Sequence, residues 1–418
     1  MVVSTSPRWR LWLIAILSAF GMLTSLGASA LLLVVGLGGL LTRTEGLQNV
    51  ALLNMAWAAA LVGILCFPAL RLAVNELGGK TSPIKPPRRA WLYASLGLLL
   101  WVPVALLFEP VETSNFAPAL LPPLVLLATV LPLWWYLEIG RRDLPGNSRL
   151  NQWGLTSLSL TGTLPVVMIL ELTVMLVIVL VIAVYAASQP ALVAELERIA
   201  ALLNNTTVDP QIIEDLAAQF LQQPAVIAGI LIVASLIIPL IEEMFKPLAV
   251  WLFAGARLTP AQGFEAGMIS GACFALLENL TALSTAGDGS GTVTMIGRLG
   301  AGLLHITTSG LLGWAIAATW QARKGWLRLL GVYLAAVLLH GLWNAFGLLA
   351  GAAPILQISE ELQTTVQWLG NFAIAGLVGL IVLNFTLLNL MNRRLRREAA
   401  PPDAIPYTKD PSDGIIDA

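Results

Sequence analysis

Ten long apolar stretches alternate with short polar segments along this 418-residue chain. Each is long enough, at about 18 residues or more, for an α-helix to cross the hydrocarbon core of a bilayer. The pattern predicts an all-α fold, a polytopic membrane helix bundle with about ten transmembrane helices. The predicted spans are 11–41, 49–70, 90–108, 117–138, 162–187, 225–254, 263–284, 293–319, 326–351 and 367–391.

Composition supports a membrane protein. The chain is 57% hydrophobic and only 11% charged, with a mean hydropathy of +0.81, whereas a soluble domain is about a quarter charged. The predicted surroundings are therefore the lipid bilayer of the cell membrane. A net charge of −1 argues against nucleic acid as a partner. Cys66 and Cys273 both lie in apolar runs and lack the spacing of metal ligands or of a disulfide framework.

The positive charges predict an orientation. If the N-terminus is cytoplasmic, only Arg43, Arg198 and Arg298 fall on the outer side, and Lys246 lies within a span. All other Lys and Arg residues then face the cytoplasm, as the positive-inside rule requires. Both termini are therefore expected inside. The first apolar run continues to Leu41, too far for a signal peptide, so we expect an uncleaved first helix.

The polar segments divide the chain into four regions. Residues 1–187 form an N-terminal five-helix membrane region to which the sequence assigns no role. Residues 188–224 form an extracytoplasmic amphipathic segment, either a surface helix packed on the bundle or a lid over a site. Residues 225–391 form a C-terminal five-helix region with a candidate core at 225–350. Residues 392–418 are predicted to be a disordered cytoplasmic tail.

The sixth predicted span carries Glu242, Glu243 and Lys246. Ionisable side chains at membrane depth are costly and mark functional sites unless they serve only as a structural ion pair. Glu242 and Lys246 are four residues apart and can pair on one face of a helix. Such a pair leaves the other carboxylate free, an arrangement suited to general acid–base chemistry.

The seventh span combines a small-residue face with a buried acid. Gly263, Gly267 and Gly271 recur every four residues, which allows another helix to approach closely. Glu278 lies seven residues beyond Gly271 on the same face, so we expect it to point into the bundle, followed by Asn279.

Both histidines of the chain lie in the next two spans. Arg298, His305 and Ser309 share a stripe of the eighth span, and His340 and Asn344 share one on the ninth. A single histidine on an apolar helix usually serves packing, but two such pairs favour a polar site. His340 and Asn344 can donate to a developing oxyanion, while His305 could be a base, an orienting group or a metal ligand.

These residues resemble the four motifs of the PrsW family of intramembrane proteases, in order and on separate spans. The matching segments are Glu242-Glu243-x-x-Lys246, Phe274-x-x-x-Glu278-Asn279, His305-x-x-x-Ser309-Gly310 and His340-x-x-Trp343-Asn344. The resemblance covers about residues 225–350. It implies an intramembrane endopeptidase with Glu242 and Glu243 as its catalytic core and with His305 and His340 essential or supporting.

The family is similar to the CAAX prenyl endopeptidases and to bacteriocin-processing membrane proteases. Those CAAX-type enzymes have His where this chain has Glu278 and Arg where it has Lys246, so their mechanism cannot be transferred whole. The resemblance implies a bacterial protein with a membrane-protein substrate, such as an anti-sigma factor or another signalling protein. It leaves the cleavage site and the oligomeric state unassigned.

Two mechanisms fit these residues. In the favoured one, Glu242 with Glu243 activates water, His340 and Asn344 stabilise the oxyanion, and Glu278, Lys246, Asn279, Arg298 and Ser309 contribute or support. In the other, zinc held by Glu243, Glu278, His305 and His340 activates the water. No cofactor is certain, and no ligand pair of the His-x-x-x-His type lies on one helix.

Two other functions compete with proteolysis. Intramembrane Glu, Lys and His residues also build proton-coupled transporters, but we see no repeat between the halves and no paired broken helices. A non-catalytic scaffold of the same fold is the third alternative. Glu171 stands alone in the fifth span and is interpreted as a structural contact.

Overall fold

The computed structural model describes residues 7–42, 46–80, 89–188, 224–254, 258–285, 291–352 and 360–399, together with Glu197. These residues form helices and no strands, which confirms the all-α prediction. Ten helical spans are long and apolar enough to cross a membrane within these ranges. The predicted amphipathic segment 188–224 and the tail beyond Ala399 lie almost entirely outside the described residues.

The N-terminal half contributes five spans. The elements are α1 (Arg8–Leu41), α2 (Gly46–Leu77), α3 (Ala90–Leu99), α4 (Trp101–Glu112), α5 (Ala117–Gly140), α6 (Arg149–Leu158), the π-helical segment η1 (Ser159–Thr163) and α7 (Leu164–Ala187). The fifth span begins at Arg149, well before the predicted residue 162. Hydropathy missed this start because the first turns of α6 are polar.

The C-terminal half contributes the other five. Its elements are α10 (Pro224–Ile232), the π-helical segment η2 (Val233–Ile237), α11 (Ile238–Phe245), α12 (Leu248–Ala254), α13 (Pro260–Thr285), α14 (Gly291–Ala322), α15 (Trp326–Ala352) and α16 (Glu360–Ala399). Helix α16 continues to Ala399, so residues 392–399, predicted to be disordered, are helical.

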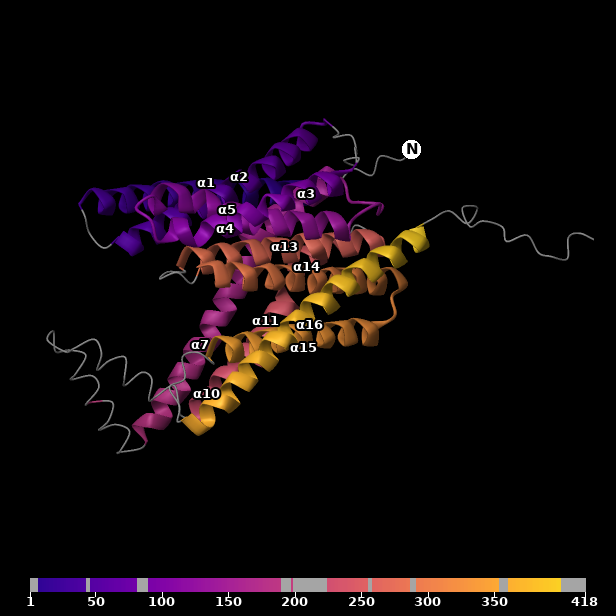
Figure 1. The fold of residues 1–418 in the computed structure, drawn as a ribbon. Coiled ribbons are helices and arrows are strands. Elements are labelled where there is room, and N and C mark those ends of the chain that lie inside the picture. Colours follow the sequence, from indigo (N-terminus) through magenta and orange to yellow (C-terminus); the bar gives the residue numbers. More distant parts are fainter. Residues whose placement is uncertain are drawn as a thin grey trace, which may run out of the picture.

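Helices α13 and α14 form the centre of the bundle. They pack side by side, with α5 against both, and α14 also contacts α15 and α16 (Figure 1). They are the two most buried of the ten spans. By contrast, α7 and α15 leave many large apolar side chains exposed, as expected for helices whose outer faces meet lipid.

The fifth and sixth spans are irregular. Each contains a π-helical segment followed two residues later by proline, at Pro165 and Pro239. The sixth span is also interrupted at Lys246 and Pro247, between α11 and α12. Proline lacks a backbone N–H and its ring clashes with the preceding turn, so helices deform around it.

Candidate active site

The carbonyl of Lys246 lies at the break after α11 and accepts a hydrogen bond from α13. Pro247 ends the helix because it cannot donate to the preceding turn. The Ser270 hydroxyl donates to the Lys246 carbonyl oxygen at 2.6 Å. The turn that carries Glu242, Glu243 and Lys246 is thereby held against α13, and all three side chains are buried.

The π-helical segment fixes α15 beside the same turn. With π-helical i→i−5 spacing, the Ala234 carbonyl would accept from residue 239, which is proline and has no N–H. The Asn344 amide donates to that carbonyl instead, at 2.8 Å. Tyr333 adds a bond to the Leu240 carbonyl at 2.9 Å. The Asn344 N–H group is thus used in positioning α15, and this geometry gives no support to its predicted role as an oxyanion donor.

The glycine face of α13 brings α14 close, as the sequence predicted. A Cβ atom on Gly267 would overlap the Ser309 carbonyl, and one on Gly271 would overlap the His305 carbonyl. Only a hydrogen at these positions allows the two backbones to meet. Ser309 is fully buried at this crossing. The crossing also fixes the position of His305 along the bundle, because His305 lies on α14 one turn before Ser309.

Lys246 is the centre of the site. Its buried ammonium donates to Glu243 Oε1 and contacts His305 Nδ1, both at 2.8 Å. It also forms an ion pair with Glu242 Oε2 at 2.8 Å and lies 4.3 Å from the centre of the Phe274 ring. The predicted pairing of Glu242 with Lys246 is present, but Lys246 contacts both carboxylates, so neither is free of it.

These contacts assign the protons of both histidines. An ammonium only donates, so His305 Nδ1 accepts and its proton is on Nε2. That Nε2 lies 2.7 Å from Glu278 Oε2. His340 Nδ1 lies 2.9 Å from Glu243 Oε1, which accepts its proton. His340 Nε2 therefore keeps its lone pair and lies 3.8 Å from Glu242 Oε2.

Glu278 closes the other side of the cluster. Arg298 forms an ion pair with it at 2.8 Å and donates from Nε to Asn279 Oδ1 at 2.6 Å. The Glu278 side chain is 38% exposed, whereas those of Lys246 and Glu243 are fully buried. The side with Glu278 is therefore where the cluster meets its surroundings.

Glu171 is a site residue that sequence reasoning missed. It interacts electrostatically with Glu242, Lys246 and Glu278, because α7 packs against α11. The sequence predicted that Glu171 is a structural contact outside the cluster. The sequence shows Glu171 only as a single acid among apolar residues. No rule of helix spacing relates it to Glu242, some 70 positions away.

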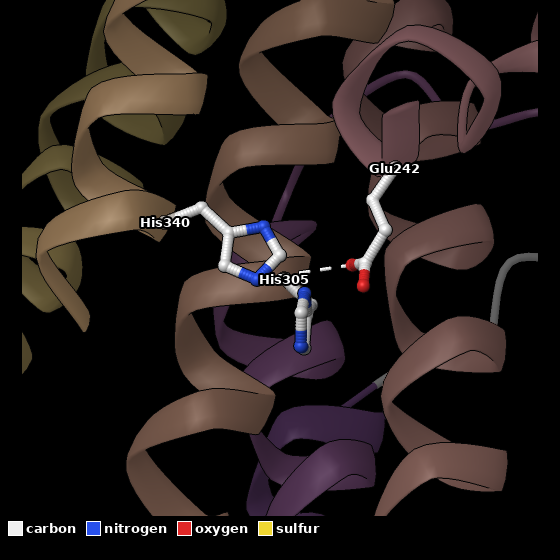
Figure 2. A group of neighbouring side chains, drawn as sticks. All are labelled: Glu242, His305 and His340. Atoms are coloured by element: carbon white, nitrogen blue, oxygen red, sulfur yellow. Dashed lines mark ion pairs between the residues drawn. The ribbon is translucent and has the colours of Figure 1, made fainter. Parts of the chain in front are cut away.

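Three side chains from three helices could hold a metal ion. A carboxylate oxygen of Glu242 and ring nitrogens of His305 and His340 lie within 4.8 Å of one another (Figure 2). Two imidazoles and one carboxylate are a ligand set of catalytic zinc sites. The predicted set of Glu243, Glu278, His305 and His340 differs, since both of those glutamates are bonded to the outer nitrogens of the histidines.

The fold and the cluster define a multi-pass integral membrane protein with a buried glutamate–histidine site. A protein-family model described as PrsW family intramembrane metalloprotease matches residues 171–375. The segment is similar to that family, and the match supports a membrane-embedded peptidase. The match begins at Glu171 and includes every residue of the cluster, extending beyond the predicted 225–350. Searches of curated proteins and of solved structures gave no match.

Proposed function

We propose that the protein is an intramembrane endopeptidase that hydrolyses membrane-anchored protein substrates, with signalling proteins such as anti-sigma factors as one class. The observation that carries the proposal is the gap between Glu242 Oε2 and His340 Nε2. Both atoms are hydrogen-bond acceptors and cannot bond to each other; they lie 3.8 Å apart, and a water molecule between them could donate to both.

Glu242 is the better placed of the two adjacent glutamates to act on that water. It retains 7% exposure, whereas Glu243 has none. Its carboxylate can accept a proton as the water attacks a peptide carbonyl. Glu243 then acts through His340, because it binds the Nδ1 proton and directs the Nε2 lone pair to the gap.

The other charged residues support these two. Glu278 and Arg298 hold His305 from the opposite side. Lys246 balances part of the charge of Glu242 and Glu243, which would otherwise repel each other at close range. These groups are thus paired by charge, but one carboxylate oxygen of each of Glu242, Glu243 and Glu278 has no hydrogen-bond partner among the described residues.

The cluster also fits a divalent metal ion. Its four carboxylates, Glu171, Glu242, Glu243 and Glu278, face two permanent cations, Lys246 and Arg298, which leaves negative charge in excess. Both histidines present one nitrogen to a carboxylate and the other inward, the usual arrangement of histidine ligands. Glu242, His305 and His340 would hold the ion, which when bound would lower the pKa of water and polarise the scissile carbonyl.

The test is cleavage of single-span substrates by purified protein reconstituted in liposomes. We expect Glu242→Gln to reduce turnover by a factor on the order of 10² to 10⁴, the contribution of a general base. The matched control is Glu112→Gln, which alters a buried glutamate bonded to the Gly291 amide, outside the cluster.

Undiminished cleavage by Glu242→Gln would reject the proposed role of this carboxylate. Proton or solute flux through the same liposomes, lost in Glu242→Gln and without any proteolysis, would instead favour the transporter. Loss of cleavage on treatment with a chelator, restored by Zn²⁺, would establish the metal-dependent reaction.

A further inference from the structure

A second polar region lies at the other end of α13. A cavity with a volume of about 1030 Å³ opens between the start of α3, the segment linking α5 to α6, the start of α13 and the end of α16. Glu265 lies on its wall, 13 residues before Glu278 on the same helix. At about 1.5 Å per residue, that separation is about 20 Å along the helix, so the cavity is distinct from the catalytic cluster.

Arginine dominates this cavity. The charged residues on its wall are five arginines and three acids: Arg89, Arg141, Arg142, Arg149, Arg396, Glu138, Asp143 and Glu265. The wall therefore carries a formal excess of two positive charges. Trp91 lies beneath the Arg142 guanidinium, 4.0 Å from it, as in the aromatic belts of membrane interfaces.

The acids neutralise only part of this set. Glu138 forms an ion pair with Arg141, and Glu265 contacts Arg141 at 3.5 Å. Glu265 is otherwise occupied, since it accepts from the Asn147 amide and from Gln152.

Asp143 is the third acid, and it is shared between two cations. It lies 3.4 Å from Arg142 and 3.5 Å from Arg396. Within the part of the chain that the structure describes, Arg89 and Arg149 have no carboxylate partner. The cavity is therefore suited to an anion.

An apolar cavity adjoins the basic one. It has a volume of about 340 Å³ and shares Glu138, Arg141 and Gln152 with the basic cavity. The rest of its wall is almost entirely apolar, formed by side chains of α2, α5, α6 and α13 such as Leu65 and Ala272. Cavities of this size are typical of ligand sites. Together the two cavities offer a charged part and an apolar part to one ligand.

We propose that an anionic phospholipid binds here, with its phosphate in the arginine-lined cavity and an acyl chain in the apolar one. The expected cytoplasmic position of this end of the bundle agrees, because that leaflet carries anionic lipid and basic pockets between helices bind its headgroups. A free phosphate ion would explain the first cavity but would leave the second unused.

Native mass spectrometry of the detergent-purified full-length chain tests this. Titration with phosphatidylglycerol should give one tightly bound lipid, and phosphatidylcholine of the same chain length should bind more weakly. In Arg142→Gln/Arg149→Gln, binding should weaken about thirtyfold, since each arginine near an anionic headgroup contributes a factor of roughly five. The control is Arg393→Gln/Arg397→Gln, which removes two exposed arginines of α16 that do not line the cavity.

The apolar cavity is tested by Ala272→Phe, which fills it without altering the arginines. This variant should lose affinity for the long-chain lipid and retain affinity for a short-chain phosphatidylglycerol. Millimolar inorganic phosphate should not displace the long-chain lipid. Equal binding of the two lipids, equal loss in both arginine double variants, or displacement by phosphate alone would overturn the proposal. Peptidase activity does not enter these measurements.

Discussion

A single lysine organises the candidate site at the scale of individual residues. Lys246 is fully buried and contacts Glu242, Glu243 and His305. Buried charges are tolerated only when partners replace the lost water. Two of its partners, Glu242 and His305, are also candidate metal ligands. An ion and the Lys246 ammonium would therefore compete for the same atoms.

Replacement of Lys246 tests whether its ammonium and a metal ion compete for Glu242 and His305. We expect Lys246→Met to bind Zn²⁺ more tightly than the unmodified chain, because Glu242 and His305 are released. The same variant should be less stable without metal by about 3–5 kcal/mol, the usual cost of breaking a buried ion pair. Zinc affinity is measured by competition with a fluorescent chelator, and stability by thermal unfolding in detergent.

Lys246→Arg is the matched control, since it keeps a cation at this position. Its zinc affinity should stay near that of the unmodified chain. If Lys246→Met bound zinc no better than Lys246→Arg, competition between the lysine and the metal would be excluded.

At the scale of helices, the crossing of α13 and α14 fixes the distance between Ser270, which holds the Lys246 turn, and His305. The two backbones are in contact at Gly267 and Gly271, so the spacing is set by the absence of side chains. Any added atom must push the helices apart, since protein interiors have little free volume.

Gly267→Ala tests this crossing. The added methyl group would overlap the Ser309 carbonyl, and such overpacking costs about 1–3 kcal/mol. We expect a lower melting temperature and, because His305 moves with α14, a lower rate of substrate cleavage.

Gly297→Ala on α14 is the control, because nothing lies within 4 Å of the new methyl group. It should raise stability by up to about 1 kcal/mol, the helix-propensity difference between Ala and Gly. A Gly267→Ala protein as stable and as active as Gly297→Ala would contradict the close crossing.

The sequence predicts the helices better than their irregularities. Long apolar runs identified all ten spans, and the four-residue spacing of Gly263, Gly267 and Gly271 correctly indicated a close helix pair. Pro239 signals a disturbance, but the π-helical segment depends on Asn344 from another helix to satisfy the freed carbonyl. Glu171 could not be assigned to the site, because the packing of α7 on α11 leaves no periodic trace in either sequence.

At the scale of the whole molecule, the charge distribution predicts both termini on the cytoplasmic side. The basic end of the bundle, with Arg142, Arg149 and Arg396, would then face the cytoplasm, and the segment near Glu360 would face outward. Ten spans lie within the described residues, and an even number would place both termini on one side of the membrane.

Single-cysteine labelling in sealed cells measures this orientation. The background is a chain in which buried Cys66 and Cys273 are replaced by alanine. A cysteine at Ser4 or Ser412 should react with a membrane-impermeant maleimide only after the cells are opened, whereas one at Ser359 should react in intact cells. Labelling of the termini in intact cells would reverse the orientation.

The buried ammonium of Lys246 also bears on how the protein is made. Several carboxylates buried at membrane depth would repel one another and oppose helix assembly unless a cation were bound. Here the chain supplies part of that charge itself, from a residue three and four positions after the acids with which it pairs. A newly inserted polypeptide is therefore expected to close its helices without a bound ion.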